Sequence, residues 1–129
     1  MNAYLTITLP PPPKALRPNY RLVWQAKLKP KKEARDLAEK ETKEVLLSAG
    51  GIPQGYVPTG YAVRWYYRLG VAPDVDNVLA SCKAYIDGVC DALGVNDRDL
   101  ECRGIGRVKA KAAYIELLIY LGRQEQLLF

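Results

Sequence analysis

The chain has 129 residues, of which 49% are hydrophobic and 26% charged, and its formal net charge is +5. This composition is typical of a folded globular protein and excludes wholesale disorder, and the length predicts one domain over residues 1–129. The chain contains no histidine, which excludes Ser–His and Cys–His nucleophiles. Acid–base chemistry would therefore use carboxylates, lysine, tyrosine or a metal-bound water.

Neither a zinc site nor a membrane segment is expected. Cys82, Cys90 and Cys102 have no CxxC spacing, so reduced thiols are favoured over zinc ligands. No apolar run approaches the roughly 20 residues that a membrane-spanning helix needs. Residues 1–14 lack the charged and apolar regions of a signal peptide. We therefore expect a cytoplasmic protein that does not associate with membranes.

The charges separate along the chain into two basic arms around an acidic centre. Residues 14–43 carry ten Lys or Arg against four Asp or Glu, and residues 103–123 carry five against one. Residues 71–101 carry seven acids against Lys83 and Arg98. Basic arms suit a polyanion such as DNA, although an ordinary solvated surface is the alternative. The acidic centre would repel that polyanion unless a cation screens it.

The first half of the chain predicts one strand and one long helix. Residues 3–9 alternate as a β-strand does, and the four prolines that follow form a stiff extended segment. Residues 20–26 are either a short strand or the lead-in to a helix. We expect the helix itself over residues 31–49, with Pro30 in its first turn and Gly50 at its end.

The second half predicts three strands and a second helix. Residues 61–69 alternate, with Tyr61 and Val63 on one face. A helix is expected from Asn77 to about Leu93, ended by Gly94. Residues 103–111 and 113–121 are expected to form an antiparallel pair, the first of them basic.

The acidic centre contains the strongest candidate for a metal site. Asp74 and Asp76 are two residues apart, so their side chains would point the same way in an extended chain and could share one ion. Carboxylate oxygens are the ligands that hard divalent cations prefer. Asp76 or Asn77 would then cap the helix that follows.

The predicted helix has two distinct faces. Its apolar stripe is expected to be buried and comprises Val78, Leu79, Cys82, Tyr85, Ile86, Val89 and Leu93. On another sector lie Lys83, Asp87 and Asp91, beside a line of small residues formed by Ala80, Ala84 and Gly88. Lys83 would neutralise a scissile phosphate or orient water, or else form an ordinary surface pair with Asp87.

Asp97 is a further candidate ligand, but it is expected to lie far from Asp74 and Asp76. A continuous helix from Asn77 to Leu93 would span roughly 24 Å and separate Asp97 from Asp74 and Asp76. Either the helix breaks early, for example near Gly88, or Asp97 serves the other subunit of a dimer. In the second case the small-residue line would form the contact between subunits.

These motifs resemble the RusA family of Holliday junction resolvases, which is common in prophages. The matching pieces are D-x-D-N at residues 74–77, Lys83, D-A-L at residues 91–93 and N-D at residues 96–97. The opening TLPPPP with Asn19 and the basic strands near the C-terminus are also similar, so the resemblance covers most of the chain. Two features depart from it. The lysine follows Asn77 by six residues rather than three, and the arginine run before the first aspartate is missing.

The resemblance implies a homodimeric endonuclease that uses Mg²⁺, with Mn²⁺ as a possible substitute, to make paired nicks in four-way DNA junctions during recombination and repair. It implies an α+β fold with a small mixed or antiparallel sheet and two main helices. It makes Asp74, Asp76 and Asp97 the essential carboxylates and metal ligands, and Lys83 the essential lysine.

A wider set of side chains is expected to contact DNA. The basic arms and Asn19 provide the candidates, which are Lys14, Arg17, Asn19, Arg21, Lys31, Lys32, Arg68, Arg103, Arg107, Lys109 and Lys111. Tyr20, Tyr56 and Tyr66 would stack on unpaired bases or simply pack. Two alternatives remain open: a non-catalytic DNA-binding protein, and a Mg²⁺-dependent nuclease for other branched or flapped DNA.

Overall fold

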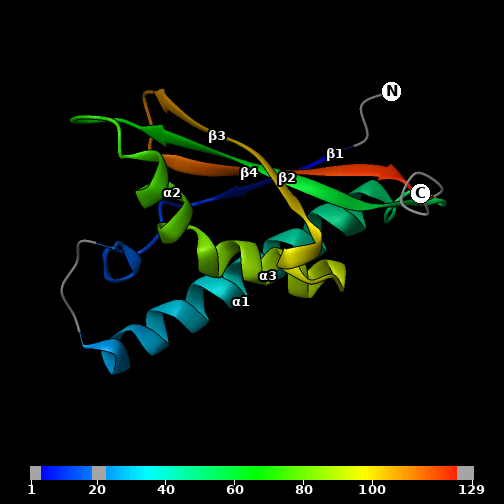
Figure 1. Ribbon diagram of the computed structural model, residues 1–129, viewed down its shortest axis with the longest axis horizontal. Coiled ribbons are helices and arrows are strands. Elements are labelled where there is room, and N and C mark those ends of the chain that lie inside the picture. Colours follow the sequence, from blue (N-terminus) through cyan, green and yellow to red (C-terminus); the bar gives the residue numbers. More distant parts are fainter. Residues whose placement is uncertain (1–3, 19–22, 125–129) are drawn as a thin grey trace.

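The computed structural model describes residues 4–18 and 23–124. Figure 1 shows that the helices lie on one side of a twisted sheet. In chain order the elements are β1 (Tyr4–Leu9), a 3-10 turn η1 (Lys14–Leu16), α1 (Trp24–Ala49), β2 (Tyr56–Tyr67), α2 (Val75–Ser81), α3 (Lys83–Leu93), a second 3-10 turn η2 (Asp97–Asp99), β3 (Glu101–Lys109) and β4 (Tyr114–Arg123). The expected α+β class, with a small mixed sheet and two main helices, is confirmed.

The sheet has the strand order β1-β4-β2-β3. β4 is antiparallel to both of its neighbours, whereas β2 and β3 are parallel and are connected through α2, α3 and η2. Parallel neighbours need such a crossover, and here the crossover is the acidic segment of the sequence. The topology thus places this segment beside the basic edge strand β3.

The core lies between the sheet and α1 and α3. Its most deeply buried side chains are Ile7, Leu9, Val63, Val78, Cys82, Val89, Ile115 and Leu117. Tyr85 is also buried, and its hydroxyl donates a hydrogen bond of 2.8 Å to the Pro10 carbonyl. This bond attaches the proline segment to α3. Among the described residues, no helix is long and apolar enough to cross a membrane.

The expected antiparallel pairing of the last two strands is wrong. A short connection between strands favours a hairpin, yet β4 lies on the far side of β2 from β3. Burial explains the difference. β4 is apolar and largely buried, which suits the sheet interior, whereas β3 is basic and largely exposed, which suits an edge.

Two helix boundaries also differ from expectation. α1 begins at Trp24, so Pro30 lies inside the helix rather than in its first turn; residues 24–26 belong to this helix, in agreement with the second of the two alternatives for residues 20–26. The expected helix from Asn77 to Leu93 is broken at Cys82, whose backbone (φ −94°, ψ 0°) separates α2 from α3. The break therefore comes earlier than Gly88. The expected ends at Gly50 and Gly94 are confirmed, since both adopt the left-handed conformation that favours glycine.

The small-residue line of α3 packs against α1 within the same chain. A Cβ added at Gly88 would lie 2.1 Å from the backbone oxygen of Arg35 and 2.9 Å from the Cβ of Ala38. Ala84 is buried as well. The expectation that this line contacts a second subunit is therefore wrong for Ala84 and Gly88, because α1 already covers them.

We expect Gly88→Ala to lower the free energy of unfolding by about 1–3 kcal/mol, because backbone must move to admit the methyl group. Urea denaturation followed by circular dichroism measures this change. Gly104→Ala is the matched control, since no atom lies within 4 Å of its added Cβ. Equal stability of the two variants would contradict the close packing of α1 and α3.

Candidate active site

The break at Cys82 places Lys83 at the start of α3, where it meets two carboxylates. Its ammonium group donates a hydrogen bond of 2.9 Å to Asp87, one turn further along the helix. It also forms an ion pair with Asp97, the first residue of η2. Asp97 thus reaches Lys83 of its own chain. The helix does break early, as one alternative expected, but Asp97 contacts Lys83 rather than Asp74 and Asp76.

The three charges stabilise one another. Burial opposes the charge of Lys83, but hydrogen bonds to Asp97 and Asp87 outweigh this effect and raise the pKa of Lys83 above its ordinary value. The hydrogen bond from Lys83 lowers the pKa of Asp97. At neutral pH the lysine is therefore a cation and Asp97 an anion.

Tyr61 and Cys102 lie beside this cluster on neighbouring strands. They are register partners in the parallel pairing of β2 and β3. Burial and the adjacent thiol raise the pKa of Tyr61 to about 12, and the charges of Lys83 and Asp97 also act on it. The phenol therefore keeps its proton and can donate a hydrogen bond.

Asp91 belongs to a separate ion pair that holds α3 to α1. Arg35 donates to its two carboxylate oxygens from Nε (2.5 Å) and Nη2 (2.8 Å). This bidentate contact lowers the pKa of Asp91 and raises that of Arg35. Its position next to Gly88 indicates a structural role for Asp91.

Asp74 and Asp76 lie at the other end of α2. Asp74 is the N-cap residue but its side chain makes no capping hydrogen bond, and Asp76 is in the first helical turn. Asp74 has the expected extended backbone (φ −64°, ψ 149°), but Asp76 is helical, and the expected cap at Asp76 or Asn77 is wrong because Asp74 takes that position. Both carboxylates are exposed. Within the described residues neither forms an ion pair, and the positive end of a helix favours acids at this position.

The basic edge strand β3 lies directly beside the start of the acidic segment. The guanidinium of Arg107 donates a hydrogen bond of 3.2 Å to the carbonyl of Pro73. Arg103 donates to the Thr59 hydroxyl (3.1 Å) and lies 4.9 Å from the centre of the Tyr120 ring. Lys109 ends the strand and Lys111 follows it, both exposed. The structure thus brings part of one basic arm next to Asp74.

The remaining DNA-contact candidates are more scattered. The Lys14 and Arg68 side chains are exposed, and the Arg17 guanidinium lies 5.8 Å from the Trp65 ring centre. Lys32 pairs with Asp36 at 2.7 Å, and Lys31 is exposed on α1. Asn19 and Arg21 lie outside the described residues.

Of the three tyrosines expected to stack on bases or to pack, two lie within the described residues, and both rings have neighbours within the chain. Tyr66 stacks on Tyr114 with ring centres 4.3 Å apart, so its ring is already used in packing. Tyr56 has the Arg123 guanidinium 5.8 Å from its ring centre. Tyr20 lies outside the described residues.

The structure therefore splits the predicted site into two groups. Lys83 and Asp97 are together, and Asp74 and Asp76 are at the far end of α2, whose seven residues cover about 10 Å. Across residues 4–18 and 23–124, no three Asp, Glu, Cys or His side chains are grouped closely enough to hold a metal ion. Sequence reasoning left the role of Asp87 open and missed Tyr61. The Lys83–Asp87 spacing of four was the signal for Asp87, whereas nothing local indicated Tyr61.

Comparisons with known proteins leave the chemistry of these residues unassigned. No protein-family model matches the chain. Over 94 residues it is 38% identical to an uncharacterized protein of Xylella fastidiosa (strain Temecula1), an alignment that covers 72% of this chain and 60% of that protein. The chain thus spans less than two thirds of that relative. A solved cyanuric acid hydrolase from A. caulinodans is similar over 95% of this chain and 39% of its own, with 12% identity and a TM-score of 0.44.

We expect Lys83→Gln to raise the pKa of Asp97 towards its ordinary 3.8, because the lysine is the main cause of the lowering. Since the folded pKa lies below that value, the pair stabilises the fold above it and loses this effect as the pH falls through the folded pKa. The variant should therefore lose less stability on acidification. Carboxyl NMR titration measures the pKa, and Asp91, paired with Arg35, is the control that should not move.

Proposed function

We propose that this protein is a metal-dependent endodeoxyribonuclease of the RusA type that resolves four-way DNA junctions by paired nicks in recombination and repair. The observation that carries the proposal is the position of Lys83. Its ammonium is held between Asp87 and Asp97, one short helix away from the exposed Asp74 and Asp76. A fixed cation near carboxylates that have no ion pair among the described residues suits the hydrolysis of a phosphodiester, whose transition state gathers negative charge.

The donor set at the start of α2 fits a magnesium ion. Mg²⁺ is commonly held by one or two carboxylates together with waters and substrate phosphates. Asp74 and Asp76 supply two exposed oxygen ligands with no cationic partner in the described part of the chain. A bound Mg²⁺ or Mn²⁺ would supply an activated water and stabilise charge on the leaving oxygen. Asp97, the third ligand expected from the motif, instead holds Lys83.

Lys83 acts electrostatically in this proposal. Its pKa is raised by Asp97 and Asp87 despite the opposing effect of burial, so it stays protonated near neutral pH and is unsuited to act as a general base. A phosphate that approaches the ammonium would share it with the two carboxylates. Asp87 and Asp97 therefore orient the lysine and are positioning residues.

The basic surface supports a nucleic acid as the substrate. Arg107 lies beside the start of α2, and Arg103 and Lys109 extend along the same edge strand. Such side chains contact backbone phosphates, which favours recognition of DNA shape over sequence. Paired nicks in a four-way junction require two active sites, so we propose a homodimer acting in the cytoplasm.

One observation favours a second candidate, a non-catalytic DNA-binding protein. Lys83 and Asp97 neutralise each other, so this part of the acidic segment is stable without a metal. The two functions differ in what Asp74 and Asp76 do, because a protein that only binds DNA gains nothing from exposed acids near its basic strand.

We expect Asp76→Asn to reduce nicking of a synthetic four-way junction in Mg²⁺ by at least about 100-fold, because one of two metal ligands is lost. Junction binding, measured by mobility shift in EDTA, should be kept or tightened, since a negative charge is removed. Glu44→Gln makes the same charge change on exposed α1 and should cleave normally.

Three outcomes would overturn parts of this proposal. Absence of Mg²⁺-dependent cleavage by the unmodified protein would favour the binding protein. Faster cutting of flaps than of junctions would move the substrate to another branched DNA. Equal cutting of linear duplex would remove the junction specificity.

We expect Lys83→Arg to retain much of the cleavage rate and Lys83→Gln to lose about 10²–10³-fold, because the role assigned to this residue is a positive charge. The cleavage rate is measured from pH 6 to 9 for both the unmodified protein and Lys83→Arg. The plot of log rate against pH should have the same shape for both, with no inflection that is present only in the unmodified protein. An inflection present only in the unmodified protein would assign the lysine to proton transfer.

A further inference from the structure

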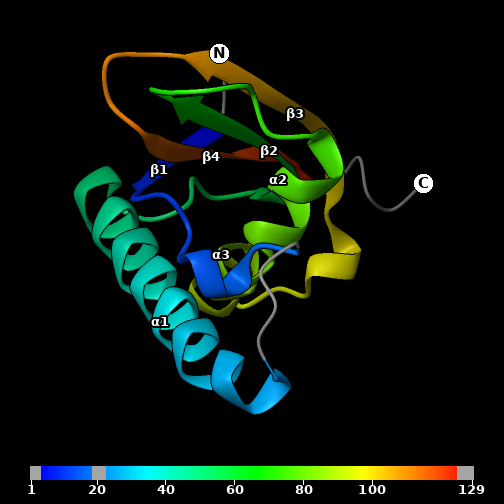
Figure 2. The same cartoon turned by 90° about the vertical axis from the view of Figure 1, so that its left-hand side faces the viewer.

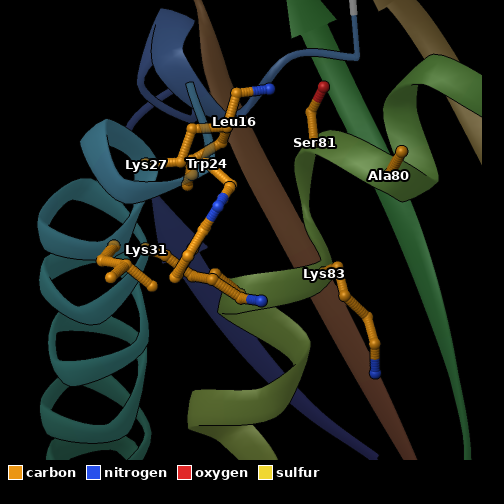
Figure 3. Close-up of a pocket in the computed structure, with 9 residues that line it drawn as sticks. Leu16, Trp24, Lys27, Lys31, Ala80, Ser81 and Lys83 are labelled. Atoms are coloured by element: carbon orange, nitrogen blue, oxygen red, sulfur yellow. The ribbon is translucent and has the colours of Figure 1, made fainter. Parts of the chain in front are cut away.

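A cavity of about 360 Å³ lies between the first turns of α1 and the junction of α2 with α3. Trp24, Lys27 and Lys31 line one wall, and Ala80, Ser81 and Lys83 line the other (Figure 3). The cavity is therefore next to the candidate active site and shares Lys83 with it, whereas four of its nine lining residues come from α1, a helix that the site does not use. Figure 2 shows that this end of α1 extends away from the sheet.

The α1 side of the cavity carries apolar side chains that residues 4–18 and 23–124 leave exposed. Trp24 is 68% exposed and Leu28 is 54% exposed. The buried residues of α1 begin only at Ala34, so the first turns of the helix lie outside the core. An exposed indole beside a cavity indicates a binding surface rather than a packing one.

The lysines around this indole divide into two pairs. Lys29 lies 3.9 Å from Glu33 and Lys32 lies 2.7 Å from Asp36, and neither lines the cavity. Lys27 and Lys31 do line it, and among the described residues they have no carboxylate partner. The residue four positions after Lys27 is Lys31, and the residue four positions after Lys31 is Arg35. Neither lysine therefore has an acid at the i+4 position, where Lys29 and Lys32 have one. The cavity therefore combines an aromatic face with two uncompensated positive charges.

This chemistry selects between the possible occupants. A second copy of the chain would bring Lys27 and Lys31 close to the same lysines across a two-fold axis, where like charges repel. A nucleotide offers an aromatic base for the indole and phosphates for the lysines. Its charge is complementary to the wall of the cavity.

We propose that this cavity binds an unpaired nucleotide of the DNA, with its base stacked on Trp24 and the flanking phosphates on Lys27 and Lys31. The inference rests on the proposed function and extends it, because it adds a subsite for a base that has left the duplex. Lys83 lines the same cavity while its ammonium group contacts Asp87 and Asp97. A strand held by Trp24 thus passes next to the candidate catalytic lysine.

Tryptophan fluorescence provides a direct test. The chain has two tryptophans, and Trp65 is only 7% exposed, so quenching on addition of a ten-nucleotide oligothymidylate reports mainly on Trp24. The titration uses the full chain in EDTA, so that binding is separated from cleavage. We expect strong quenching and, for Trp24→Leu, an affinity for the oligonucleotide weakened by about 5- to 150-fold.

Paired lysine variants test the phosphate contacts. The double variant Lys27→Gln/Lys31→Gln should reduce the slope of log affinity against log salt by about 1.4, or 0.7 for each lost phosphate contact. The matched control Lys29→Gln/Lys32→Gln removes the same charge from the same helix and should change the slope by less than half as much. Circular dichroism confirms that each variant is folded.

The outcomes separate this inference from the proposed function. Absence of quenching, unweakened binding by Trp24→Leu, or equal slopes for the two lysine pairs would overturn the subsite. A Trp24→Leu variant that changes self-association in sedimentation, with unchanged DNA affinity, would make the patch a protein interface and also overturn it. Quenching without junction cleavage would support the subsite while the proposed nuclease fails.

Discussion

The close approach of α3 to α1 at Gly88 fixes the geometry on which the rest of the site depends. The Arg35 carbonyl occupies the place where any other residue at position 88 would carry its Cβ. The same arginine binds Asp91 through two hydrogen bonds, so backbone packing and an ion pair hold α3 in one position. Lys83 at the start of α3 then meets Asp97, and the first turns of α1 extend past the core to form the cavity around Trp24.

Three of the seven acids in the acidic segment form ion pairs within the chain. Arg35 pairs with Asp91, and the single charge of Lys83 is shared between Asp87 and Asp97. Of the five aspartates considered above, Asp74 and Asp76 are left without an ion pair in the described part of the chain, at the start of α2 where the helix dipole already favours negative charge. The proposal thereby becomes more specific, because Asp74 and Asp76, rather than all five aspartates considered above, must account for any dependence on a divalent cation.

Local patterns predicted β1, the alternation of β2 and the glycine ends of α1 and α3. A strand buried on one face alternates apolar and polar residues, and a helix end with positive φ favours glycine, so both features can be read from the local sequence. Local patterns did not predict the break at Cys82, where neither proline nor glycine marks the change of direction. Nor did they predict that β4 pairs with β2 rather than with β3, since a short connection favours a hairpin. The contrast between exposed, basic β3 and apolar β4 was the available signal for edge and interior positions. The contacts of Arg35 with Asp91 join residues far apart in sequence, and the periodicity of hydrophobic residues gives no information about such pairs.

The order of charges along the surface has a consequence for metal binding under the proposed function. Lys27 and Lys31 lie near the C-terminal end of α2, across the cavity from Ala80 and Ser81. Arg107 contacts Pro73, just before the N-terminal end of α2. Asp74 and Asp76 lie at this N-terminal end, so each end of α2 has basic side chains beside it. A DNA strand that contacted both basic regions would bring its phosphates close to two carboxylates that no cation in the described part of the chain pairs with. That contact is unfavourable without a divalent cation and favourable with one, because the ion can bind carboxylate and phosphate oxygens together. Metal and DNA would therefore bind cooperatively, each raising the affinity of the other by the same factor.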